Sequence, residues 1–189
     1  GGAYGIDAAA HRGVVSADGR TIGVYAGGLD EPYPRGNARL YEQLAADHLV
    51  VSEVAPGLRP TRAGFLARNR LIAALCLGTV VVEAAQRSGA RNTASWAAEL
   101  GRVVMAVPGP VHSAMSVGCH RLIRDGQATL VSDGDDVAAL LAPMGRGPQL
   151  PLGGAERPLD RLEPHLLGVR EAMPGNRSVS AAEVAAGCG

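Results

Sequence analysis

Two arginines and an asparagine stand side by side at positions 68–70, in the segment FLARNRLIAAL of residues 65–75. The apolar spacing of this segment predicts a helix with one buried side. The helix dipole disfavours guanidinium groups near a helix beginning, so Arg68 and Arg70 indicate an anion that comes from outside. Phe65, the only phenylalanine of the chain, lies three residues before Arg68. An aromatic ring beside two guanidiniums and the amide of Asn69 is the chemistry that holds a phosphate together with a stacked base.

Other interpretations of these residues remain open. Phe65 could be an ordinary core residue. Arg68 and Arg70 could be solvated at the surface, or could pair internally with Glu53 or Glu83. The amide between the two arginines could cap the helix instead of bonding to the edge of a base.

Small and hydroxyl-bearing residues recur in the loops that follow the predicted strands. In a parallel sheet these loops meet at one edge, where ligands bind. Glycines let the backbone approach a ligand closely, and a hydroxyl at a helix start lies beside free N–H groups. The residues that carry this pattern are Gly27, Gly28, Ser88, Gly89, Thr93, Gly109, Ser116 and Gly118, with Arg87 and Arg91 flanking the 88–89 turn. Together they predict a phosphate-binding edge, although each loop alone is equally well explained by helix capping.

Strand-like apolar runs alternate with helical patterns along most of the chain. The predicted strands are 21–26, 49–52, 79–83, 103–107 and 128–132, and the predicted helices are 37–47, 65–75, 92–101, 119–126 and 133–144. Strict alternation of this kind predicts an α/β fold with a mostly parallel sheet and helices on both faces. Aromatic residues are scarce in the chain, and Ala, Val, Leu and Gly are used in their place, which suits close packing of helices on such a sheet.

The two ends of the chain depart from this alternation. The opening GGAYGIDAAAHRGV runs from a glycine turn straight into a helix, which predicts that a strand is missing before Gly1. The Gly- and Pro-rich stretch GRGPQLPLGGAERP predicts a linker, over residues 145–157, between a domain of residues 1–144 and a tail of residues 158–189. LDRLEPHLLGVREAM and SVSAAEVAAG in the tail predict two short helices, with Ser180 and Glu183 forming a capping box.

Charge is balanced overall but not evenly distributed. The formal net charge is zero, yet residues 59–124 contain nine arginines and only two acids. The chain has no lysine, so every side-chain cation apart from histidine is a guanidinium, the group that binds phosphate through two parallel hydrogen bonds. Three widely spaced cysteines and the lack of a long apolar run or signal peptide predict a cytosolic protein with reduced thiols.

The motifs of several enzyme classes are incomplete or missing in this sequence. Glu83 ends a strand where the catalytic acid of a nucleotide phosphoribohydrolase would lie, but the run PGGxGTxxE of those enzymes is missing. A metal hydrolase could use Asp7 and His11, which share a helix face, but these two residues are better explained by capping and packing. The other histidines lack the spacing of metal ligands. Neither a nucleophile elbow nor a dinucleotide fingerprint is present. We therefore expect no catalytic residue, metal or cofactor, and keep open a non-catalytic interaction module built on helix 135–142.

A set of motifs resembles one family in order and spacing. The motifs are GIDAAAH, GGLDEPYP, SEVAPG, FLARNRLIAAL, VVVEAAQRSGARNTASWAAELGR, MAVPG and GCHRLIRDGQATLVSD, and they occur within residues 1–142. They are similar to those of the DNA-processing protein A family, also called DprA or Smf. The resemblance implies an extended Rossmann-like, three-layer domain without a cofactor. It also implies a cytoplasmic homodimer that binds single-stranded DNA, protects it and loads the RecA recombinase during natural transformation.

The same resemblance implies site residues by their place in the motifs. The DNA-binding set would be Phe65, Arg68, Asn69, Arg70, Ser88, Gly89, Thr93, Gly109, Ser116 and Gly118, with Arg87 and Arg91 beside it. Dimerisation and RecA contact would fall on Asp136, Val137, Leu140 and Leu141. The tail resembles the beginning of a winged-helix domain.

The chain also departs from the family pattern. The glycine-serine-arginine turn of the family is missing, and GGAY replaces the usual serine-glycine opening. Arg91 and Asn92 stand where apolar residues are common, and His120 replaces a frequent asparagine. These differences leave one basic pocket residue unassigned and make the packing around Asn92 uncertain from sequence.

Overall fold

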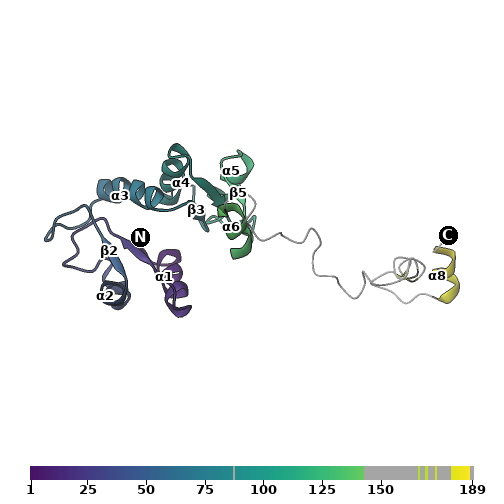
Figure 1. Ribbon diagram of the computed structural model, residues 1–189. Helices are drawn as coiled ribbons and strands as arrows, with labels where there is room; N and C mark the ends of the chain where they lie inside the picture. Colours follow the sequence, from purple (N-terminus) through teal and green to yellow (C-terminus); the bar gives the residue numbers. More distant parts are fainter. Residues whose placement is uncertain (87, 143–165, 167–168, 170–172, 174–179, 188–189) are drawn as a thin grey trace. The chain divides into compact units, whose positions relative to one another are not determined.

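A computed structural model describes residues 1–86, 88–142, 166, 169, 173 and 180–187 (Figure 1). The chain divides into two compact units, Gly1–Pro148 and Gln149–Gly189. In the first unit, strands β1 (Ile22–Val24), β2 (Leu49–Val51), β3 (Gly78–Val81), β4 (Val103–Ala106) and β5 (Thr129–Leu130) alternate with helices. The helices are α1 (Ile6–Ser16), the 3-10 turn η1 (Arg35–Asn37), α2 (Ala38–Asp47), α3 (Arg62–Leu75), α4 (Gly89–Glu99), α5 (Val117–Arg124) and α6 (Gly134–Leu141).

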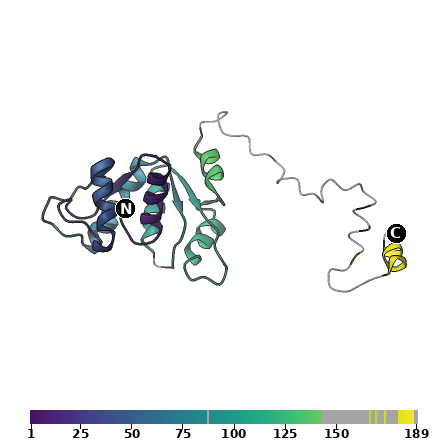
Figure 2. The same ribbon diagram turned by 90° about the horizontal axis from the view of Figure 1, so that it is seen from below.

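All described strand pairs are parallel. β1 pairs with β2, with Ile22 opposite Leu49, and β3, β4 and β5 form a second sheet in that order. The predicted α/β fold is therefore confirmed, with each strand one to three residues shorter than its apolar run. Figure 2 shows α1 and α2 near the first sheet and α5 and α6 near the second. Because the strands of each sheet are parallel, the loops that follow them leave from the same edge of that sheet.

Alanine dominates the larger core. Ala73, Ala84, Ala94, Ala97 and Ala106 are all buried in the cluster that joins α3 and α4 to the three-stranded sheet. Small side chains let these layers approach closely, so the scarcity of aromatic residues noted in the sequence reflects this packing. A smaller cluster of Ala8, Leu40 and Leu44 holds α1 and α2 together.

The described part of the second unit contains α8 (Ala181–Gly187). The predicted capping box is confirmed, because the backbone N–H of Ser180 donates to Glu183 Oε2 at 2.8 Å and the N–H of Glu183 donates to Ser180 Oγ at 3.3 Å. The predicted linker and Cys188 lie outside the described residues. The same holds for most of the first predicted tail helix and for most of the segment that resembles a winged-helix domain. Within the described ranges, no helix is long and apolar enough to cross a membrane.

Gly118 is the tightest backbone approach between α5 and the strand edge. Its N–H donates to the carbonyl of Ala84 at 2.7 Å, and a Cβ built on it would lie 2.6 Å from that carbonyl oxygen. We expect Gly118→Ala to lower the free energy of unfolding by about 1–3 kcal/mol, because the backbone of Ala84 would have to move. Urea denaturation measures this change.

Gly13→Ala is the matched control for that substitution. Gly13 lies inside α1, and a Cβ there would meet no atom within 4 Å. We expect it to raise stability by about 0.5–1 kcal/mol through helix propensity alone. Equal effects of the two substitutions would contradict the packing explanation.

Candidate functional site

Three adjoining cavities follow the carboxyl ends of β1, β2 and β3. The inner cavity, of about 420 Å³, is lined by Ala3, Tyr4, Gly5, Ile6, Asp7, Phe65, Leu66, Arg68, Asn69, Ile72, Glu83, Ser88, Gly89, Ala90, Thr93 and Met115. The aromatic cavity, of about 260 Å³, is lined by Gly2, Ala3, Tyr4, Tyr25, Ala26, Gly27, Gly28, Glu31, Tyr33, Pro34, Pro60, Phe65 and Arg68. The outer cavity, of about 420 Å³, is lined by Gly28, Asp30, Glu31, Pro32, Tyr33, Arg35, Gly57, Leu58, Arg59 and Pro60. Each cavity shares wall residues with the next, so the three adjoin one another, and we refer to them together as the groove.

Aromatic rings gather in the middle of this groove. The chain has only six aromatic residues, and four of them, Tyr4, Tyr25, Tyr33 and Phe65, line the aromatic cavity. The rings of Tyr33 and Phe65 lie 6.0 Å apart between centroids, and burial raises the pKa of Tyr25 to about 12. Phe65 is half-buried and faces two cavities, so the core-residue alternative for it does not describe its position.

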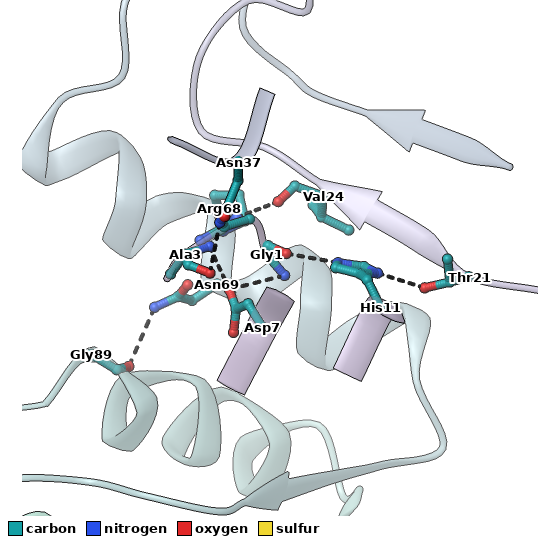
Figure 3. A network of polar contacts seen from close by, with 11 residues as sticks. Gly1, Ala3, Asp7, His11, Thr21, Val24, Asn37, Arg68, Asn69 and Gly89 are labelled. Carbon is teal, nitrogen blue, oxygen red and sulfur yellow. Dashed lines mark hydrogen bonds and ion pairs between the residues drawn. The ribbon is translucent and has the colours of Figure 1, made fainter. Parts of the chain in front are cut away.

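Arg68 is held at the wall between the inner and aromatic cavities. One of its terminal nitrogens, Nη1, donates to the backbone carbonyl of Val24 at the end of β1, and its guanidinium carbon lies 5.9 Å from the Phe65 ring centroid. Its Nε is buried and has no hydrogen-bond partner among the described residues. Burial lowers the pKa of Arg68, while nearby Asp7 opposes that shift. The result is a positioned, partly desolvated cation with an unused donor (Figure 3).

Arg70 lies apart from Arg68. Its Nη2 donates to both carboxylate oxygens of Glu53, at 2.8 and 2.6 Å, and it lines none of the three cavities. Residues two apart on a helix face away from each other, which explains the separation. The two arginines therefore do not line the same cavity. For Arg70 the structure shows the internal pair with Glu53, one of the alternatives that the sequence left open.

Asn69 connects α3 to the turn at residues 88–89. The residue is 7% exposed, and its Nδ2 donates to the carbonyl of Gly89 at 3.4 Å (Figure 3) and to Asn92 Oδ1 at 3.2 Å. Ser88 in that turn caps α4 by accepting from the N–H of Ala90 at 3.2 Å. Asn69 thus positions the Ser88 turn against the inner cavity, and Asn92 acquires a polar partner that sequence alone did not reveal.

The remaining predicted residues divide into three groups. Thr93 lines the inner cavity with Ser88 and Gly89, whereas Gly27 and Gly28 line the aromatic cavity. Arg91 donates to the carbonyl of Gln86 at 3.3 Å and lines none of the three cavities, while Arg87 lies outside the described residues. The last group packs within the fold and lines none of the three cavities; it consists of Gly109, Ser116 and Gly118.

The helix expected to mediate association is capped by its own acids. Asp133 accepts from the N–H groups of Asp135 and Asp136, and Asp136 Oδ2 accepts from the N–H and the hydroxyl of Ser132, both at 2.7 Å. These hydrogen bonds lower the pKa of Asp136. Of the predicted contact residues, Leu140 is exposed, whereas Val137 and Leu141 are half-buried.

The structure adds residues that the sequence interpretation did not single out. Tyr4, Tyr25 and Tyr33 complete the aromatic cavity, and Arg35 and Arg59 line the outer one. No hydrogen bond or ion pair involves the side chain of either arginine in the part of the chain that the structure describes. The signal for Tyr33, Arg35 and Arg59 was available, because GGLDEPYPR and LRP both lie in loops that follow strand ends.

Acidic side chains also enter the groove. Glu83 and Asp7 line the inner cavity, so the acid required by the phosphoribohydrolase alternative does face the Ser88 turn. Asp7 accepts a hydrogen bond from the N–H of Ala3 at 3.1 Å, and Asp30 in the outer cavity accepts from the N–H of Gly57 at 2.8 Å. In the described residues, no cluster of three or more side chains could hold a metal ion.

This combination defines a Rossmann-like α/β protein with a concave, aromatic- and arginine-lined groove at the carboxyl ends of its strands. The chain belongs to the DNA recombination-mediator protein A family, whose sequence model matches residues 1–142. It is 49% identical over 193 residues to the putative DNA processing protein DprA of Mycobacterium tuberculosis, covering all of this chain and 48% of that protein. It is 41% identical over 136 residues to Protein Smf of Escherichia coli, covering 71% of this chain and 36% of that protein.

Two solved structures share the fold. DNA processing protein A from Streptococcus pneumoniae superposes with a TM-score of 0.70 at 49% identity, covering 72% of this chain and 48% of that one. The structure of DNA processing protein A from Helicobacter pylori, which addresses the single-stranded DNA binding mode of that protein, gives a TM-score of 0.57 at 29% identity, covering 60% of this chain and 52% of that one. The chain spans about half the length of the curated DprA relatives it matches.

His11 on α1 joins the first residue of the chain to Thr21, the residue before β1. Its Nε2 lies 2.8 Å from the carbonyl of Gly1 and its Nδ1 lies 2.7 Å from Thr21 Oγ1 (Figure 3). A carbonyl can only accept, so Nε2 carries the proton and Nδ1 accepts from the threonine hydroxyl. Burial, the largest effect, lowers the pKa of His11, which keeps the imidazole neutral and its two bonds intact.

We expect this histidine to make stability fall in acid. The unfolded chain takes up a proton below the ordinary histidine pKa of about 6.5, whereas folded His11 resists it until a lower pH. Stability is therefore full above pH 6.5 and declines below it, by at most about 1.4 kcal/mol per pH unit, until the folded pKa is reached. Urea denaturation at pH 7.5 and 5.5 measures this, with His11→Gln removing the His11 share and exposed His112→Gln retaining it.

Proposed function

We propose that this chain binds single-stranded DNA in the three-cavity groove, as part of DNA processing in recombination. In this proposal a cytoplasmic homodimer protects incoming strands during natural transformation and passes them to the RecA recombinase, without chemical turnover. Family membership supports the general role, and the Helicobacter pylori relative, studied for its single-stranded DNA binding mode, supports the ligand.

The shared position of Phe65 and Arg68 carries the proposal. Both side chains line the inner and the aromatic cavities, so a strand lying in the groove must pass them. Stacking of a base on an aromatic face contributes about 1–3 kcal/mol and does not depend on sequence. The Arg68 guanidinium beside the ring supplies the charge that a phosphodiester needs, and its anchoring to Val24 avoids the entropy cost of ordering a long side chain.

The groove favours an unpaired strand over a duplex. Aromatic stacking requires an exposed base face, which a duplex supplies only at its ends. Arg35 and Arg59 extend the cationic path into the outer cavity, where neither is neutralised by a described partner. Phosphates that pass the aromatic cavity would meet these two guanidiniums next.

Association of two copies is proposed for α6. Leu140 is 38% exposed on this helix, and Val137 and Leu141 flank it. The acids at the beginning of α6 are occupied by capping, which leaves the apolar residues of its second half to make the contact. The same surface is our candidate for the RecA contact.

Arg68 and Arg70 provide a matched pair of substitutions for the DNA site. We expect Arg68→Ala to weaken oligothymidine binding at least about tenfold, and to lower the slope of log affinity against log salt by about 0.7 for one lost phosphate contact. Arg70→Ala should change both quantities little, because Glu53 already neutralises that guanidinium. Fluorescence anisotropy at two or more salt concentrations measures both.

Two results would contradict this proposal. Equal binding by the parent and Arg68→Ala would remove the groove from consideration. Release of free base from nucleoside monophosphates, lost in Glu83→Gln, would favour the phosphoribohydrolase alternative, because Glu83 faces the inner cavity.

A charged residue at position 140 tests the association surface. We expect Leu140→Asp to shift the chain from dimer to monomer, because a carboxylate cannot be buried in an apolar contact without a partner. Light scattering at several concentrations gives the molar mass. Leu100→Asp, which alters a leucine that is 48% exposed near the end of α4, should leave the mass unchanged. A parent that is monomeric at every concentration would rule out the α6 contact.

A further inference from the structure

Glu31 occupies an unusual place in the groove. It lies on the wall shared by the aromatic and outer cavities, and no hydrogen bond or ion pair involves it in the described part of the chain. The neighbouring Asp30 is different, because its carboxylate is occupied by the N–H of Gly57. A free carboxylate in a groove for a polyanion weakens binding unless it recognises something other than phosphate.

The aromatic cavity is therefore lined by two side chains of complementary hydrogen-bonding character. The exposed Glu31 carboxylate can only accept hydrogen bonds, whereas the Arg68 guanidinium can only donate them. The rings of Tyr33 and Phe65, 6.0 Å apart between centroids, line the same cavity and offer flat apolar faces. A planar ligand with adjacent donors on one edge and acceptors on another would satisfy the whole cavity.

Among the DNA bases, guanine matches this description. Its N1–H and N2–H₂ groups are adjacent donors that a carboxylate can accept with both oxygens. Its O6 and N7 atoms are the acceptors that arginine binds. Adenine and cytosine offer a single amino group, and thymine presents two carbonyls on either side of one N–H, which would face the Glu31 carboxylate unfavourably.

We propose that Glu31 is a specificity-determining residue that makes the aromatic cavity prefer guanine within single-stranded DNA. The inference rests on the proposed function, since it concerns which base enters the same groove. Stacking on Phe65 supplies binding for any base, and Glu31 adds discrimination between them.

Short oligonucleotides that differ at one base test the proposal. We expect the parent to bind TTGTT at least about fivefold more tightly than TTTTT, the lower end of what one bidentate base contact contributes. TTITT, in which inosine lacks only the N2 amino group, should lose most of this advantage. Glu31→Gln should remove the difference between guanine and inosine and strengthen binding of TTTTT, because a negative charge leaves the groove.

Glu42→Gln is the control for charge, because Glu42 is exposed on α2 and lines none of the cavities. Equal binding of TTGTT and TTITT by the parent, with TTTTT still bound, would overturn the role of Glu31 and leave the proposed function standing. A guanine preference that survives in Glu31→Gln, or disappears equally in Glu42→Gln, would also overturn it. Failure of the parent to bind any of the strands would instead refute the proposed function.

Discussion

The groove depends on one hydrogen bond between a side chain and a strand end. Arg68 donates to the carbonyl of Val24, the last residue of β1, and this contact fixes the guanidinium against the Phe65 ring. The contact joins α3 to the first sheet, so helix, strand and cavity wall are placed together. A cation held in this way is partly removed from water, which strengthens its attraction for an anion that reaches it.

Paired and unpaired charges distinguish structural from functional groups around this contact. Arg70 and Glu53 neutralise each other away from the three cavities. Asp133 and Asp136 accept hydrogen bonds at the beginning of α6. Arg68 donates to a neutral carbonyl and forms no ion pair among the described residues, although the nearby Asp7 carboxylate favours its charged form. An exposed ion pair such as Arg70–Glu53 adds little stability, and it holds one guanidinium away from the three cavities.

Asn69, which the sequence suggested for recognition of a base, has a positioning role in the structure. Asn69 lines the inner cavity and bridges to Asn92 and Gly89, so it orients the Ser88 turn. A buried amide with satisfied hydrogen bonds specifies one arrangement of the two helices, because leaving either partner unpaired is costly. Asn92, which departs from the family pattern, is thus explained by its partner on α3.

The sequence by itself determined the alternating α/β order, the approximate position of every described strand, and the edge at which functional loops collect. These features follow from local periodicity and from the geometry of parallel strands, which need no knowledge of distant contacts. Only the tertiary structure decided that Arg68 faces the groove while Arg70 meets Glu53, and that the Gly109–Gly118 region packs inward. It alone gathered Tyr4, Tyr25 and Tyr33 around Phe65, because rings that are up to 61 positions apart in the chain become neighbours only when the loops are folded together.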